Sequence, residues 1–396
     1  MGGGRMVTRR SALIGGGLGA AALLAGARPA LASVLAPNAG VARAAGATER
    51  PPLWKQAAAR GIVYGSSTAT WQLDPDYARL FAREAGILFT EDDLLWYRLR
   101  PSIDSGLDFS FGDQIIGFAE SNGQFVFGAH LAWDEGFGEG WTEDELFGLS
   151  EQQARSLLFG TIRAEVARYR GRVDAWSVAN EVTDPETGDR NGLRTDVPWY
   201  QTIGPSYVAE SFHLARANDP NAVLVINEFG FETGENPAAR RATMLKVIDY
   251  LLGKGVPVQA LGIQAHLTYD GFKQQFNPRA YRRFLSDVAD RGLRIMITEM
   301  DVLDDGLPAD IPTRDAGVAD VYRRYLDVAL DENAVKVLIT FGLSDRYTWL
   351  QEDLPRDDGA ARRPLPFDED LQPKPAYQAL SRALAGAPCR KPIWRR

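Results

Sequence analysis

Cysteine and histidine are both scarce in this chain of 396 residues. The single cysteine, Cys389, excludes an intrachain disulfide and a cysteine-based zinc site. Three histidines, His130, His213 and His266, leave little for a multi-histidine metal centre. We therefore expect a protein that works without a metal ion or another cofactor.

Blocks of basic residues are also missing, since 44 Lys and Arg stand against 52 Asp and Glu, for a net charge of −8. Binding to nucleic acid needs clustered Lys and Arg, so nucleic acid is not an expected partner. The composition, 45% hydrophobic and 24% charged, is typical of a globular protein with a sizeable core.

The longest apolar run, residues 12–27, is shorter than the ~20 residues that span a bilayer. It follows the pair Arg9-Arg10 and precedes Ala30-Leu31-Ala32, which has the small-x-small form of a cleavage site. We expect residues 1–32 to be a twin-arginine-type export signal and residues 33–50 a disordered leader. The mature protein is then periplasmic or secreted, without stable membrane insertion after cleavage; a membrane anchor is the alternative.

After residue 50, short β-rich runs alternate with helical patterns. The predicted strands cover residues 61–66, 87–90, 124–130, 173–180, 222–227, 258–267, 293–299 and 335–343. The clearest helical patterns cover residues 150–169, 205–218, 238–252, 278–291 and 316–330. Eight such units predict a single (β/α)8 TIM barrel over residues 51–386, followed by a C-terminal tail, 387–396. An open doubly wound sheet is the alternative, but no glycine-rich phosphate loop follows the first strand.

Polar and aromatic residues gather where the predicted strands end, and in a barrel those ends share one mouth. The residues are Glu91, Trp133, Asn180, Glu181, Asn227, Gln264, His266, Glu299, Asp301, Phe341, Arg346 and Trp349. Each taken alone is better explained as a helix cap or a salt bridge in a loop. Their convergence on one rim indicates a functional site.

Glu181 and Glu299 are the candidate reacting pair. Cleavage of a glycosidic bond needs two carboxyl groups, one protonated near neutral pH and one ionised. The fourth and seventh strands of a closed barrel face one another across its mouth. We therefore expect the two carboxyl groups about 5–5.5 Å apart, the spacing of a retaining glycosidase.

Several motifs resemble those of glycoside hydrolase family ten, whose members are mostly endo-1,4-β-xylanases. Trp176-Ser-Val-Ala-Asn-Glu181 resembles the family's Trp-Asp-Val-Val-Asn-Glu, and Ile297-Thr-Glu-Met-Asp301 resembles Ile-Thr-Glu-Leu-Asp. Similar matches are Gly262-Ile-Gln-Ala-His266, Phe341-Gly-Leu-Ser-Asp-Arg-Tyr-Thr-Trp349, and Pro364-Leu-Pro-Phe-Asp368 through Lys374-Pro-Ala-Tyr377. The motifs occur in the family's order from about Gly61 to Leu380.

The resemblance implies a retaining hydrolase that cleaves internal β-1,4 linkages of xylan or a related β-glycan by double displacement. Glu181 would be the general acid and then the general base, and Glu299 the nucleophile. Asn180 would bind the sugar 2-hydroxyl, and His266, oriented by Asp301, would keep Glu299 ionised. The expected supporting or substrate-binding residues are Glu91, Trp133, Asn227, Gln264, Phe341, Arg346 and Trp349.

The chain departs from the family's pattern around the second, third and eighth strands. Asp92 and Leu95 stand where the family has Asn and Lys, and Ala129 and Asp134 stand where it has His. Phe341 replaces a Trp. His130 comes one residue after the family's histidine, so alternation along a strand predicts that it points to the opposite face. These changes predict an atypical member whose contacts with outer sugars are rebuilt.

Four other functions remain open from the sequence. A non-catalytic carbohydrate-binding barrel would be expected to lose one carboxylate, but both are present. A β-glycanase acting on a decorated or non-xylan polysaccharide fits the departures. A phosphate-handling barrel lacks its glycine-rich loop. A metal-dependent hydrolase would use Asp301, Asp304 and Asp305, whose spacing matches no known ligand loop.

Overall fold

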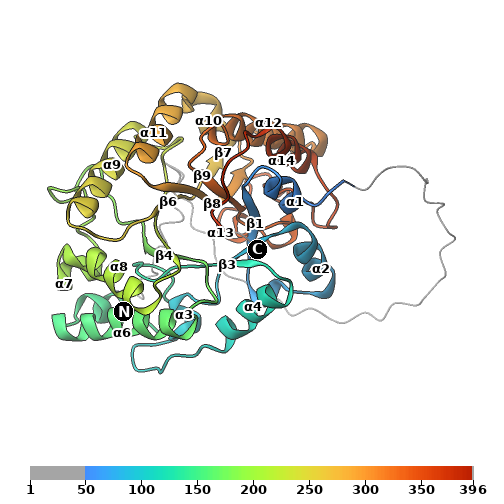
Figure 1. Cartoon of the computed structure of the whole chain (residues 1–396). Coiled ribbons are helices and arrows are strands. Elements are labelled where there is room, and N and C mark those ends of the chain that lie inside the picture. The colour runs from blue at the N-terminus through green and yellow to red at the C-terminus, as the bar shows by residue number, and fades with distance from the viewer. Residues whose placement is uncertain (1–49, 395–396) are drawn as a thin grey trace, which may run out of the picture.

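The computed structural model describes residues 50–394, and the predictions for residues 1–49 lie outside this part of the chain. Eight parallel strands pair in sequence order, and the pairings of β6 with β8 and of β9 with β1 close the ring. They are β1 (Val63–Thr68), β2 (Ile87–Thr90), β3 (Phe125–Gly128), β4 (Ala175–Asn180), β5 (Val223–Glu228), β6 (Ala260–Ile263), β8 (Arg294–Leu303) and β9 (Val335–Thr340). The helices surround this ring (Figure 1), so the predicted single (β/α)8 barrel is confirmed.

The sixth predicted strand, residues 258–267, is wrong as one continuous element. It is divided into β6 and a short strand, β7 (His266–Thr268). Ala265, between them, has a φ of 61°, a left-handed conformation that interrupts an extended strand. Strand β7 pairs with the end of β8, with His266 beside Asp301. The break therefore brings His266 to the mouth of the barrel.

The five predicted helices lie within a few residues of α6 (Glu151–Arg168), α8 (Ser206–Asn218), α9 (Pro237–Gly253), α11 (Pro278–Asp290) and α12 (Ile311–Ala329). The structure adds α1 (Leu53–Ala58), α2 (Pro75–Glu84), α3 (Trp96–Leu99), α4 (Ser110–Ser121), α5 (Glu143–Phe147), α7 (Pro198–Ile203), α10 (Tyr269–Gln275), α13 (Leu350–Asp353), α14 (Pro375–Gly386) and the 3₁₀ turns η2 (Thr70–Gln72) and η3 (Asp345–Tyr347). Within residues 50–394, no helix combines the length and apolar character needed to cross a bilayer.

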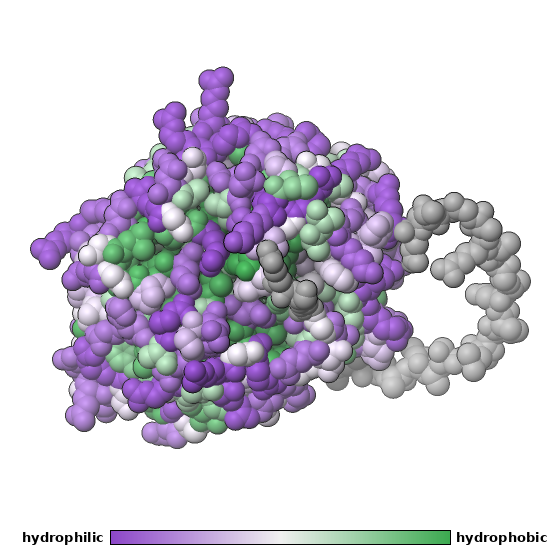
Figure 2. All heavy atoms as spheres, viewed as in Figure 1, coloured by the Kyte–Doolittle hydropathy of each residue, from purple (hydrophilic) through white to green (hydrophobic). Residues whose placement is uncertain are grey.

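Large apolar side chains fill the barrel interior, and the C-terminal segment covers its amino-terminal end. Trp394 packs on Phe125, the first residue of β3, with ring centroids 5.0 Å apart. The Arg390 guanidinium donates to the carbonyl oxygens of Leu330, Glu332 and Val335 near the start of β9. Figure 2 shows polar residues around the rim of this view and hydrophobic residues nearer its centre. With this end covered, the opposite, carboxyl end is the open one.

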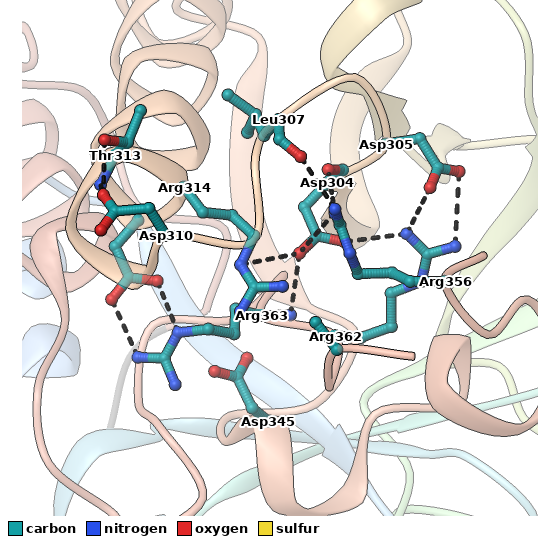
Figure 3. Close-up of polar contacts among 12 residues, drawn as sticks. Asp304, Asp305, Leu307, Asp310, Thr313, Arg314, Asp345, Arg356, Arg362 and Arg363 are labelled. Atoms are coloured by element: carbon teal, nitrogen blue, oxygen red, sulfur yellow. Dashed lines mark hydrogen bonds and ion pairs between the residues drawn. The ribbon is translucent and has the colours of Figure 1, made fainter. Parts of the chain in front are cut away.

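A buried cluster of ion pairs fixes the loop that follows β8 (Figure 3). Asp304 is fully buried, and its carboxylate lies 2.9 Å from Arg362 Nη1 and 3.6 Å from Arg314 Nε. Arg356 donates to the backbone carbonyl of Asp304 at 2.7 Å. Arg362 also binds Asp305. Because these arginines come from α12 and from the segment after α13, the cluster joins the loops at the ends of β8 and β9.

We predict that Asp304→Ala lowers the free energy of unfolding by about 3–5 kcal/mol, because it leaves buried arginines without their carboxylate. The matched control is Asp320→Ala, which removes a half-exposed partner of Arg323 and should cost at most about 1 kcal/mol. Urea denaturation measures both values. Equal, small losses of unfolding free energy in the two variants would show that the Asp304 cluster stabilises the fold no more than a surface ion pair does.

Candidate active site

Two glutamates lie at the open mouth, one directly after β4 and one within β8. Glu181 has a φ of 56°, and its backbone N–H donates to the Asn227 carbonyl at 3.0 Å. The Glu299 N–H donates to the Gln264 carbonyl at 2.9 Å. Both backbones are therefore fixed by the neighbouring strand, and the left-handed turn at Glu181 ends β4 at the mouth.

Side-chain amides link the two carboxyl groups. Asn227 Nδ2 donates to Glu299 Oε1 at 2.7 Å and to Asn180 Oδ1 at 2.8 Å. Gln264 Nε2 donates to Glu181 Oε1 at 2.9 Å and to Asn180 Oδ1 at 3.3 Å. The structure thus brings five of the predicted site residues, from β4, β5, β8 and the end of β6, into one continuous hydrogen-bond network.

Glu299 lies beside an imidazole that is held in place from its other side. His266 Nε2 is 3.3 Å from Glu299 Oε2, and His266 Nδ1 is 2.9 Å from Asp301 Oδ1. The Trp349 indole N–H donates to the second Asp301 oxygen at 2.7 Å. Burial opposes a charge on His266, but Asp301 and Glu299 raise its pKa to about 10. His266 is therefore an imidazolium at neutral pH.

The pKa values of the two glutamates move in opposite directions. Burial favours a protonated Glu299, but the hydrogen bond and charge of His266 outweigh it and hold the Glu299 pKa below its ordinary value. At Glu181, burial and the nearby carboxylates of Glu135 and Glu228 raise the pKa to about 8, against the hydrogen bond from Gln264. At neutral pH the site therefore holds one carboxylate and one carboxylic acid.

Two grooves flank this pair. One, of about 700 Å³, is lined by Trp71, Glu91, Asp92, Leu95, Trp133 and Trp349, among others. The other, of about 780 Å³, lies on the side of His266 and is lined by Thr183, Phe229, Arg240, Thr268 and Asp305, among others. The barrel mouth is therefore hollowed on both sides of the carboxyl pair, and the two grooves together are called the cleft.

The remaining predicted residues fall at different depths in this cleft. Glu91 accepts hydrogen bonds from Ser67 and Gln72, and the Phe341 ring is buried against His266 at 5.3 Å. Arg346 lies on the outer edge of the groove that Trp71 lines, 3.1 Å from Asp74. No contact of Arg346 reaches the amide network, so its position is peripheral to the carboxyl pair.

The predicted orientation of His130 is wrong. His130 Nδ1 lies 2.8 Å from the hydroxyl of Ser177 on β4, and the ring packs against Phe89 and Trp133. Strand alternation does not apply because β3 ends at Gly128, before His130. The His130 imidazole therefore faces the barrel interior, although Ala129 stands where the family has its histidine.

Arg194 is a site residue that the sequence analysis missed, and it explains Asp134. Its guanidinium donates to both carboxylate oxygens of Asp134, at 3.2 and 2.7 Å, and to the backbone carbonyl of Glu181 at 2.8 Å. Arg194 is almost fully buried. Asp134 thus anchors the residue that positions the Glu181 backbone. No local sequence signal indicates this pairing, because the partners are 60 residues apart.

Among residues 50–394, no three His, Cys, Asp or Glu side chains form a group that could hold a metal ion. Asp304 and Asp305, considered above as metal ligands, are instead paired with arginines.

Comparison with known proteins assigns the barrel to a family. The model for "Glycosyl hydrolase family 10" matches residues 53–383. Endo-1,4-beta-xylanase B of Thermotoga neapolitana is 30% identical over 329 residues, covering 81% of this chain and 87% of that protein. Native xylanase 10B from Thermotoga maritima is 30% identical, with a TM-score of 0.73 over 84% of this chain and 98% of that one. Xylanase 10B from Thermotoga petrophila RKU-1, in complex with xylobiose, is 29% identical, with a TM-score of 0.74 over 86% of this chain and 98% of that one.

A closed barrel with paired carboxyl groups at its mouth has the architecture of a glycosidase. This chain belongs to glycosyl hydrolase family 10, so the family inferred from its motifs is confirmed.

We predict that His266→Gln raises the pKa of Glu299. The imidazolium stabilises the carboxylate, and without it burial, which favours the protonated acid, is less strongly opposed. Carbon-13 NMR of labelled glutamate carboxyls measures this value, with Glu299→Gln to assign the signal. His213→Gln, on the exposed side of α8, is the control and should leave the pKa unchanged. A lower or unaltered Glu299 pKa in His266→Gln would contradict the account.

Proposed function

We propose that this protein is a retaining endo-β-1,4-glycanase that hydrolyses internal linkages of xylan or a closely related β-glycan. The observation that carries the proposal is the joined pair of buried carboxyl groups, one kept ionised by His266 and one kept protonated by burial. Grooves on both sides of the pair suit an extended chain, and the similarity to proteins named xylanases supports xylan as the first substrate to test.

In the first step, the Glu299 carboxylate attacks the anomeric carbon and forms a covalent bond to the sugar. Glu181 gives its proton to the oxygen of the departing chain, so the glycosidic bond breaks without releasing an alkoxide. In the second step, Glu181, now ionised, removes a proton from a water molecule that attacks the same carbon. The bond to Glu299 breaks, and the product keeps the original anomeric configuration.

The surrounding residues control the charge of the nucleophile and provide contacts for the sugar. His266, fixed between Glu299 and Asp301, keeps the nucleophile ionised before each cycle. Asn180 lies beside both carboxyl groups through the amide network, in a position to bind the sugar hydroxyl next to the reacting carbon. Trp133 and Trp349 line the cleft as apolar faces for sugar rings.

A decorated xylan or a different β-glycan is the second candidate substrate. Leu95 lines the cleft at a position where a lysine would donate a hydrogen bond to a hydroxyl group. A site without that donor discriminates differently between sugars. Linear xylan, arabinose-bearing xylan and mixed-linkage β-glucan are therefore to be assayed side by side.

We predict a bell-shaped pH dependence of kcat/KM on the best of these substrates. Glu181 must be protonated for the first step, so the rate falls above about pH 8. Glu299 must be ionised, so the acid limb lies below the ordinary range of a glutamate. Glu181→Gln should lose the alkaline limb and about 10²–10⁴-fold in rate, and Glu299→Gln should fall to background.

Asp320→Ala, on the outside of α12, is the matched control and should retain the wild-type profile. Full activity of either glutamate variant on every glycan would contradict the assignment. Glycan binding without turnover by the wild-type protein would favour the non-catalytic carbohydrate-binding alternative.

We also propose that the protein is exported by twin-arginine translocation to the periplasm or beyond, with residues 1–32 as its signal. Replacing Arg9 and Arg10 by lysine should leave the protein in the cytoplasm of a bacterium that has this pathway, whereas Arg5→Lys should not. Cell fractionation with detection of the protein measures the result. Equal export of both variants would contradict the proposal.

A further inference from the structure

Trp71 is an exposed aromatic residue on the rim of the cleft. Three large hydrophobic side chains in residues 50–394 are exposed: Trp71 by 54%, Ile311 by 50% and Phe147 by 43%. Trp71 is the one of these three that lines the groove containing Trp133 and Trp349. The exposed indole therefore offers an apolar face in the groove that a ligand can cover.

A ladder of side-chain hydrogen bonds holds the turn that carries Trp71. Thr70 donates to Asp93 through its backbone N–H at 2.8 Å and through its hydroxyl at 2.9 Å. The Trp71 indole N–H donates to Asp92 Oδ2 at 2.7 Å. Gln72 Nε2 donates to Glu91 Oε1 at 3.0 Å. Three consecutive residues of η2 thus bind three consecutive acids that follow β2.

The ring is also held from the side of β9. The Tyr347 ring meets Trp71 edge-on, with centroids 5.6 Å apart and planes at 85°. Tyr347 in turn donates its hydroxyl hydrogen to Asp74, the residue that also caps α2 and pairs with Arg346. The indole is therefore anchored both at its nitrogen and against a neighbouring ring, which reduces the entropy lost when a ligand stacks on it.

Leu95, which stands where the family has a lysine, also supports a role for the Trp71 indole in binding a ligand. Leu95 lines this groove together with Asp92, whose carboxylate is engaged by the Trp71 indole. Compared with a groove that has the family's lysine at position 95, this groove offers fewer hydrogen-bond donors and more apolar surface to a ligand. A pyranose ring with equatorial hydroxyl groups presents a flat face of C–H bonds, which packs on an aromatic ring.

We propose that Trp71 is a stacking platform for a sugar ring of the bound β-glycan beyond the two rings that share the cleaved bond. The contacts of Trp71 are with Asp92 and Tyr347 rather than with the amide network around Glu181 and Glu299. The acids after β2 serve to hold this platform in place. This inference rests on the proposed glycanase function and identifies a specificity-determining residue of the same cleft.

The test compares wild-type protein with Trp71→Ala and Trp71→Phe on an aryl β-xyloside and on xylopentaose. Aromatic stacking predicts that Trp71→Ala lowers kcat/KM on xylopentaose about two- to tenfold, mainly through a higher KM. The short xyloside, which does not extend to Trp71, should lose less than twofold. Trp71→Phe keeps an aromatic face and should recover most of the loss. Phe147→Ala, an exposed aromatic residue outside both grooves, is the matched control and should match wild type on both substrates.

Equal losses on the short and long substrates would overturn the proposal, because they indicate a disturbed fold or catalytic centre. An unchanged KM on xylopentaose would also overturn it. If the wild-type protein hydrolyses neither substrate, the proposed function fails on xylan, and affinity electrophoresis in gels containing each β-glycan tests Trp71 directly. Weaker retardation of Trp71→Ala than of Phe147→Ala would support the platform; equal or absent retardation would overturn it.

Discussion

The site depends on one charge interaction, the pairing of the His266 imidazolium with the Glu299 carboxylate. A carboxyl group buried in the mouth of a barrel tends to take up a proton, because its charged form loses the solvation of water. His266 reverses that tendency at Glu299, and it keeps its own charge because Asp301 binds its second nitrogen. At Glu181, burial and the carboxylates of Glu135 and Glu228 raise the pKa to about 8, so this group remains protonated at neutral pH. The two glutamates therefore differ because His266 stabilises the charge on Glu299, while neighbouring carboxylates oppose a charge on Glu181.

That placement explains several features of the fold. The break at Ala265 and the short pairing of β7 with β8 put His266 beside Asp301. Trp349, from the loop after β9, fixes the second oxygen of Asp301. The buried arginine cluster around Asp304 then ties the loops after β8 and β9 together just beyond this point. Elements far apart in the sequence thus act together to fix the orientation of the His266 ring.

The polar residues at or beside the departures from the family's pattern have partners within the protein. Asp134 binds Arg194, which in turn holds the backbone of Glu181. Asp92 holds the Trp71 indole, and His130 binds Ser177 across the barrel interior. These polar side chains are therefore satisfied within the protein, at the rim of the cleft that surrounds the amide network.

The fold and the carboxyl pair were predictable because they depend on local signals. The spacing of apolar runs indicates alternating strands and helices, and ordered motifs locate Glu181 directly after β4 and Glu299 on β8. Helices α2, α4 and α14 were not predicted, although Asp74-Pro75 is a clear cap and first-turn signal for α2. The orientation of His130 and the partners of Asp92 and Asp134 were out of reach, because they depend on where a strand ends and on residues distant in sequence.

The central claim is that Glu299 forms the covalent bond to the sugar. A 2-deoxy-2-fluoro glycoside of the preferred disaccharide, with a good leaving group, slows the release of such an intermediate so that peptide mass spectrometry can locate it. The account predicts a single labelled peptide, with the sugar on Glu299. A label on any other residue, or inactivation without a label, would contradict it.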